Sequence, residues 1–214
     1  MTASKAHFIR FTIAMAAAIS LSLTFADLPV ARYFHSIGDG WLARLAAATT
    51  DGGLAVWYLV GAAALFLLFR FVLQRRREAM MAAFVFAAVA ASGIITDVLK
   101  VAFGRARPKL LFRDDIYGFH GFKFGAVWNS FPSGHSTTVA AMTVALCLLA
   151  PRWRLAIIPL GTALVATRVI TTAHYLSDAL FGTYVGTTTA FWVYHHFRRR
   201  GLLACPALTR GEKS

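Results

Sequence analysis

The chain has few charged residues for its length. Only 14% of its 214 residues are Asp, Glu, Lys or Arg, whereas a soluble domain carries about 25%. This polar content is too low to cover a soluble globule. The hydrophobic residues, 58% of the total, come in long runs, and the mean hydropathy is +0.61. The composition excludes an ordinary soluble protein and predicts an integral membrane protein with one helical domain.

Signatures of several other classes are also missing. The two cysteines, Cys147 in an apolar segment and Cys205 in the C-terminal tail, predict no disulfide and lack metal-ligand spacing. The net charge is +13, but no zinc-finger, basic-zipper or RNA-binding pattern accompanies it, so we expect no nucleic-acid partner. Asp114 and Asp115 are adjacent but lie beside Arg113 and aromatic residues. The sequence therefore predicts no metal site and no cofactor.

Six apolar segments are long enough to cross a hydrocarbon core of roughly 30 Å. They are residues 8–26, 54–73, 79–99, 134–150, 154–172 and 178–197. The expected fold class is all-α, a polytopic bundle of six transmembrane helices in a single domain over residues 1–200, followed by a tail over 201–214. The first segment also resembles a secretory signal peptide, because "TFA" precedes Asp27. We favour a retained span.

The connection over residues 27–53 has apolar residues at helical spacing. This pattern predicts either a helical segment lying along the membrane surface or a plain connecting loop.

The positions of Lys and Arg predict the orientation. With six spans, thirteen of the 22 basic residues fall on one side, and most of the others lie in the single loop 100–133. Several of those in the loop have another role, given below. The positive-inside rule then places both termini in the cytoplasm and the 100–133 loop on the outside. We expect a multi-pass protein of a bacterial inner membrane.

Three polar clusters fall at the predicted outward ends of the spans: "KVAFGRARP" at 100–108, "PSGH" at 132–135 and "TRVITTAHYLSD" at 167–178. Ionisable residues near membrane depth are costly and are functional candidates. Lys100, Arg107 and Arg168 would place three cations on one face, and a bound anion would relieve their mutual repulsion. Guanidinium groups can bind phosphate through bidentate hydrogen bonds.

The "PSGH" cluster combines a turn with the beginning of a helix. Ser133 offers a hydroxyl, and Gly134 lets a ligand approach the main chain. The first N–H groups of a helix have no intrahelical partner and favour anions. Common helix caps contain the same residues, so the histidines decide the interpretation. His135 lies in this cluster, and His174 precedes Asp178 by four residues, a spacing that suits a nucleophile with its orienting carboxylate.

The three clusters resemble the signature of the type-2 phosphatidic acid phosphatase superfamily. That signature reads Lys-x6-Arg-Pro, Pro-Ser-Gly-His and Ser-Arg-x5-His-x3-Asp, and every spacing is matched here. Thr167 stands where the family usually has serine, and threonine keeps the hydroxyl. The resemblance implies that the phosphate oxygens are held by Lys100, Arg107, Ser133, Gly134 and Arg168.

The resemblance also implies the chemistry. His174 attacks phosphorus and forms a phosphohistidine, Asp178 orients His174, and His135 protonates the leaving group without a metal ion. We therefore expect a membrane lipid phosphatase that acts on undecaprenyl pyrophosphate, phosphatidylglycerophosphate, phosphatidate or a lipid A phosphate. The alternatives are a lipid-to-lipid phosphotransferase, a lipid-phosphate binder or transporter, and a vanadate-dependent haloperoxidase. The sequence does not predict an oligomeric state.

Overall fold

The computed structural model describes residues 3–38 and 40–203, so Cys205 and the tail from 204 lie outside the described residues. Within those ranges the chain is helical, and its one β-type pairing is an isolated bridge between Arg105 and Phe119. The α-helices are α1 (Ala3–Leu21), α2 (Asp27–Ile37), α3 (Trp41–Thr50), α4 (Ala55–Leu67), α5 (Arg76–Phe103), α6 (Pro108–Asp114), α7 (Gly134–Leu149), α8 (Arg154–Ile170) and α9 (Leu176–Arg199). All six apolar segments expected from the sequence fall in helices.

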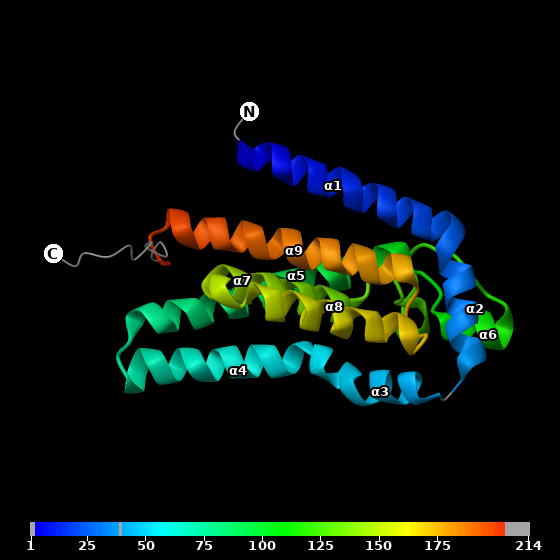
Figure 1. The fold of residues 1–214 in the computed structure, drawn as a ribbon, viewed down its shortest axis with the longest axis horizontal. Coiled ribbons are helices and arrows are strands. Elements are labelled where there is room, and N and C mark those ends of the chain that lie inside the picture. The colour runs from blue at the N-terminus through cyan, green and yellow to red at the C-terminus, as the bar shows by residue number, and fades with distance from the viewer. Residues whose placement is uncertain (1–2, 39, 204–214) are drawn as a thin grey trace.

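The long helices run side by side, and the short helices α2 and α6 lie at one end of the bundle (Figure 1). α7 packs most extensively against α9 and also contacts α5 and α8. Because α5 and α8 end where α7 and α9 begin, four helix ends meet near α2 and α6. We call this the site end of the bundle.

Small residues allow the central helices to pack closely. Phe84 of α5 is fully buried among alanines that are themselves fully buried: Ala88, Ala141, Ala145 and Ala190. Such small side chains are typical of helix interfaces in membranes, where close backbone approach replaces the hydrophobic driving force available in water.

Two glycines of α9 bring it against the backbone of α7. A Cβ on Gly182 would lie 2.5 Å from the Ser133 carbonyl oxygen, and a Cβ on Gly186 would overlap the Thr137 carbonyl oxygen. Glycines four residues apart are typical of close helix packing in membranes, and these two allow it between α9 and α7. The α7–α9 interface thus fixes the position of residues 132–135 relative to the start of α9 along the bundle.

Four helical stretches in the described residues can cross a membrane by length and composition: Lys5–Ile37, Trp41–Val72, Arg76–Phe103 and Pro151–Ile170. The apolar helix α7 has only 16 residues, and α9 is not among the four. The helical, membrane-spanning character is therefore confirmed, while the count of six spans stays a prediction.

The connection over residues 27–53 is largely helical, so the plain connecting loop is wrong, and the placement of this segment along the membrane surface stays a prediction. A π-helical turn over Ser22–Ala26 joins α1 to α2, so the first helical stretch continues to Ile37. α3 and the 3₁₀ turn Asp51–Gly53 then lead into α4. Asp27, expected only as a boundary of the first span, begins α2 and is buried.

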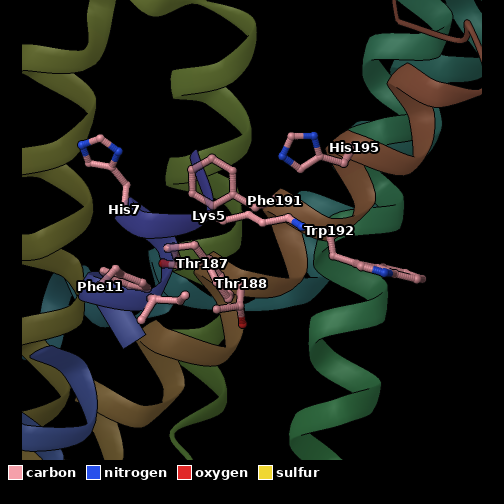
Figure 2. A pocket seen from close by; sticks show the side chains of 10 residues that line it. Lys5, His7, Phe11, Thr187, Thr188, Phe191, Trp192 and His195 are labelled. Atoms are coloured by element: carbon pink, nitrogen blue, oxygen red, sulfur yellow. The ribbon is translucent and has the colours of Figure 1, made fainter. Parts of the chain in front are cut away.

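An apolar cavity of about 690 Å³ separates α1 from the second half of α9 (Figure 2). Its lining includes Phe8, Phe11, Phe191 and Trp192. None of its lining residues belongs to the three sequence motifs, so this cavity is distinct from the candidate active site.

Candidate active site

The three sequence motifs meet at the site end because each is attached to a helix end there. Lys100 lies in the last turn of α5, and Arg107 immediately precedes α6. Ser133 is the N-cap of α7. Arg168 lies in the last turn of α8, and His174 follows in the short turn that leads into α9. α8 ends at Ile170, so Arg168 and His174 do not lie on one continuous helix.

Gly104 allows the first motif to turn sharply after α5. Its φ of +53° is left-handed, and a Cβ there would overlap the Gly121 carbonyl oxygen. Glycine is the residue that takes this helix-ending conformation without a steric penalty. The turn leads the chain from Lys100 at the end of α5 to Arg107.

Lys100 lies directly beside the start of α7. Its Nζ is 2.9 Å from the position that a Cβ on Gly134 would occupy, so a side chain at 134 would displace the ammonium group. The same Nζ lies 3.3 Å from an oxygen of Asp97, three residues earlier in α5. Gly134 therefore keeps the lysine charge against the first turn of α7.

The two motif arginines have few partners. Arg107 donates to the Asn129 carbonyl at 3.4 Å, and Arg168 donates to the Thr50 hydroxyl at 2.6 Å. The Nε atoms of both are buried and have no hydrogen-bond partner, and neither makes an ion pair with a residue that the structure describes. Burial lowers the pKa of Arg107, against the opposing charge of Asp178. The positive charges of these two arginines are therefore not balanced by an ion pair, and a bound phosphate would balance them.

Both histidines share the environment of these cations. The charges of Arg168, Lys100 and Arg107 act on His135, and the charges of Arg107 and Arg168 act on His174. His135 is the second residue of α7. The structure thus brings together the cations and histidines that the sequence singled out.

Ser133 caps α7 through its side chain. Its Oγ accepts from the Ser136 N–H at 3.4 Å and from the Ser136 hydroxyl at 2.9 Å. Acting as an acceptor in both contacts, the Ser133 hydroxyl keeps its own hydrogen for another acceptor. The N–H groups of the first turn of α7 can also donate hydrogen bonds to a bound anion.

His174 is held by a backbone carbonyl more closely than by Asp178. Its Nδ1 lies 2.7 Å from the Ser130 carbonyl oxygen and 3.6 Å from Asp178 Oδ2. A carbonyl can only accept a hydrogen bond, so Nδ1 carries the proton and Nε2 keeps its lone pair. Burial, reinforced by the charge of Arg107, lowers the pKa of His174 to about 4, although its hydrogen bond to Asp178 acts in the opposite direction. The ring is therefore neutral at physiological pH.

Asp178 is the centre of a buried hydrogen-bond network. Its Oδ2 accepts from the Ser130 hydroxyl at 2.6 Å and from the Tyr175 N–H at 2.9 Å, which caps α9. Its Oδ1 lies 2.5 Å from Arg105 Nη1. The N-cap of α9 is Tyr175, and Asp178, the third residue of the helix, accepts a hydrogen bond from its backbone N–H. Ser130 contacts both Asp178 and His174, and so links the carboxylate to the imidazole.

Arg105 joins this network to the distant Asp27. The Arg105 side chain is fully buried, and its Nη2 lies 2.6 Å from Asp27 Oδ2 while Nη1 contacts Asp178 and Ser177. Asp27 also accepts from the Ser177 N–H at 2.9 Å and from the Ser177 hydroxyl at 2.5 Å. Although burial alone lowers its pKa, the charges of Asp178 and Asp27 raise the pKa of Arg105 above its usual value. The cation is therefore permanently charged and shared between two carboxylates.

Among residues 3–38 and 40–203, no group of three His, Cys, Asp or Glu residues comes together as a metal site would require. The requirement for metal in the reaction stays a prediction to be tested by chelation.

Comparison with known families agrees with the motif positions. The model of the PAP2 superfamily matches residues 81–202, which is more than half of the chain. The chain belongs to the PAP2 superfamily. The resemblance stated from the three motifs is thereby confirmed, and this PAP2 domain includes every motif residue from Lys100 to Asp178.

Two curated relatives are similar over part of this PAP2 chain. Proteins named lipid A 1-phosphatase from Rhizobium etli and Rhizobium johnstonii are each 41% identical over 121 residues, which is 56% of this chain. That stretch covers 52% and 50% of the two relatives, so the chain matches about half of their length.

A solved structure shows the same fold. The crystal structure of a transmembrane PAP2-type phosphatidylglycerolphosphate phosphatase from Bacillus subtilis matches with a TM-score of 0.62 at 21% identity. The match covers 90% of this chain and 94% of the other.

Two charged residues of this PAP2 site, Arg105 and Asp27, could not be assigned a role from the sequence patterns. Arg105 lies inside the first motif but was grouped with the general cations of its loop. Asp27 was considered only as a possible processing boundary. An acidic residue within a long apolar stretch was the available signal, because a buried carboxylate there requires a partner.

Proposed function

We propose that the protein is a membrane lipid phosphatase that works through a phosphohistidine at His174. The observation that carries the proposal is the contact between His174 Nδ1 and the Ser130 carbonyl, which leaves the Nε2 lone pair available in a site with three cations. A nucleophile positioned and deprotonated in this way is what covalent catalysis requires.

The proposed first step transfers the phosphoryl group to the protein. Nε2 of His174 attacks phosphorus, the bond from phosphorus to the leaving oxygen breaks, and His135 supplies the proton to that oxygen. Lys100, Arg107 and Arg168 stabilise the charge on the remaining phosphate oxygens in the transition state. The Ser133 hydroxyl and the N–H of Gly134 add hydrogen bonds to the same oxygens.

The proposed second step releases inorganic phosphate. His135, now neutral, accepts a proton from water as that water attacks the phosphohistidine, and the P–N bond breaks to regenerate neutral His174. Asp178, 3.6 Å from Nδ1, stabilises the positive charge on the imidazole while the phosphoryl group is attached. Its network with Arg105 and Ser130 fixes the position of the carboxylate.

The proposed substrates are lipid phosphates or pyrophosphates presented at the membrane surface. The names of the Rhizobium relatives favour a lipid A type 1-phosphate, and the other three classes named above fit the same phosphate site. We further propose a bacterial inner membrane location with the site end outside and both termini in the cytoplasm, in accord with the distribution of Lys and Arg.

The test is phosphate release in detergent with EDTA present, using all four lipid classes. Wild-type protein should release phosphate, and His174→Ala should not. His120→Ala is the matched control, because His120 is exposed and packs against Trp128 outside the site. Acid-labile phosphate on wild-type protein, absent from His174→Ala, would identify the intermediate.

Three outcomes would contradict the proposal. Equal release by wild type and His174→Ala would remove His174 as the nucleophile. Transfer of phosphate to a second lipid without free phosphate would indicate a phosphotransferase. Lipid-phosphate binding without any turnover would indicate a binder or transporter.

A further inference from the structure

A cavity of about 620 Å³ opens beside the candidate active site. Arg107, Lys109 and Arg113 line it from the start of α6 and along that helix, and Thr171–Ala173 line it from the turn immediately before His174. Since Arg107 also belongs to the phosphate site, the cavity and the phosphate site share a wall. A group attached to the scissile phosphate would therefore extend into this cavity.

The wall formed by α2 is aromatic and flat. His35 of α2 stacks on Phe112 of α6 with ring centroids 3.7 Å apart and an interplanar angle of 5°. Both rings line the cavity. The stack joins two segments far apart in the sequence and gives the cavity a preformed side.

The charge lining the cavity is of one sign. Three basic side chains line it, and no Asp or Glu does. Arg113 is paired with the neighbouring Asp114 at 2.7 Å, but Lys109 makes no ion pair with any residue that the structure describes. Arg107 contributes a buried Nε without a hydrogen-bond partner. A lone phosphate at His174 does not need this second group of cations.

The turn on the opposite wall has an unusual backbone. Thr172 has a φ of +51°, which is rare for a β-branched residue. Its N–H donates to the Val169 carbonyl at 3.0 Å, and the Thr171 hydroxyl donates to the Thr167 carbonyl at 2.7 Å. These bonds hold the turn in place between the cavity and His174, and strained backbone of this kind occurs often at functional sites.

We propose that this cavity binds a second anionic group of the lipid headgroup, a phosphate or a carboxylate, while the first phosphate occupies the site at His174. The inference rests on the proposed phosphatase function and narrows its substrates. Phosphatidate has a single phosphate and nothing to place in the cavity. Lipid pyrophosphates, phosphatidylglycerophosphate and bisphosphorylated lipid A all carry a second anionic group.

The first experiment compares two diacylglycerol lipids in mixed micelles. Phosphatidate and diacylglycerol pyrophosphate share the same tails and differ by one phosphate. Wild-type protein should have a KM for the pyrophosphate lower by about fivefold, the effect of one partly exposed ion pair. Lys109→Gln should remove that advantage and leave the kinetics on phosphatidate unchanged.

Lys123→Gln is the matched control. Lys123 is an exposed lysine on the loop 115–133, packs against Trp128 and does not line the cavity. This variant removes the same charge from the same part of the protein. It should keep the preference for the pyrophosphate. Equal unfolding temperatures of the two variants would show that Lys109→Gln is as well folded as Lys123→Gln.

A second set of substrates locates the second anion. Preference for diacylglycerol pyrophosphate alone would place the anion next to the scissile phosphate. Preference for bisphosphorylated over monophosphorylated lipid A would place it farther along the headgroup. Either preference, if lost in Lys109→Gln, supports the proposal.

The failures of the two proposals are distinguishable. Phosphate release from phosphatidate with no preference for a second anion, or an equal rise in KM for all substrates in Lys109→Gln, would overturn the cavity proposal and leave the phosphatase intact. Absence of phosphate release from every lipid by folded wild-type protein would overturn both.

Discussion

Replacing Arg105 by methionine should be among the most destabilising changes in this protein. Methionine keeps an unbranched side chain but has no charge, so it leaves Asp27 and Asp178 without their common partner. Those carboxylates are 1% and 0% exposed, and water therefore does not replace the lost cation. Each lies within 2.6 Å of the guanidinium, so both ion pairs disappear together.

The expected cost follows from burial. Breaking a buried ion pair by removing one partner costs about 3–5 kcal/mol, and Arg105→Met should fall at the upper end because two carboxylates lose a partner. Asp27→Asn should cost about 2 kcal/mol, since it removes the ion pair with Arg105 but leaves Arg105 paired with Asp178. The double variant should cost less than the sum by about 2 kcal/mol, because Asp27→Asn removes one of the two buried carboxylates that Arg105→Met leaves without a partner.

The assay is the free energy of unfolding in mixed detergent micelles for the wild type, the two single variants and the double variant. Asp114→Asn is the control, because it breaks the exposed pair with Arg113 at 2.7 Å and should cost less than about 1 kcal/mol. Strictly additive costs for Arg105→Met and Asp27→Asn, or single costs no larger than that of the control, would refute the reasoning.

Three further predictions concern the chemistry and the packing. Because the pKa of His174 is lowered to about 4, its neutral form persists below pH 6, and phosphoenzyme formation should not fall between pH 7 and 5.5. A sharp fall near pH 6.5 would contradict this. Thr50→Val removes the hydrogen bond that holds Arg168 and should raise KM by roughly threefold to tenfold; an unchanged KM would show that Arg168 needs no such support. Gly186→Ala forces a methyl group against the α7 backbone and should lower the free energy of unfolding by about 1–3 kcal/mol. Gly61→Ala, with open space around it, is the control and should not. Equal melting temperatures of the two variants would contradict the close packing of α9.

The helices could be predicted from the sequence because long apolar runs have one low-energy state in a hydrocarbon core, where every backbone group must be hydrogen-bonded internally. All six predicted segments are helical for this reason. Their limits were less accurate: the first helical stretch continues to Ile37, because no proline or glycine interrupts it before Pro29 and the π-helical turn absorbs the bend.

The motif residues could also be predicted from the sequence. Lys100, Arg107, His135, His174 and Asp178 stand at fixed spacings next to helix ends, and local spacing is readable along a chain. Their type of chemistry follows from the residues, since cations beside paired histidines favour phosphoryl transfer.

Other parts of the site depend on contacts between distant segments. The sequence indicates no partner for Arg105, whose carboxylates lie 78 and 73 residues away in the chain. Nor does it reveal that the Ser130 carbonyl, 44 residues from His174, lies closer to the imidazole than Asp178 does. Such pairings arise only when α2, the loop after α5 and the start of α9 pack at one end of the bundle.

The sequence by itself determined a helical membrane protein and a candidate phosphate site with two histidines, because hydropathy and motif spacing are local properties. Tertiary structure decided how His174 is oriented, which buried cation balances Asp178, and that a basic cavity adjoins the candidate site. These features depend on distances across helices, and a buried charge is stable only where folding brings its partner to it.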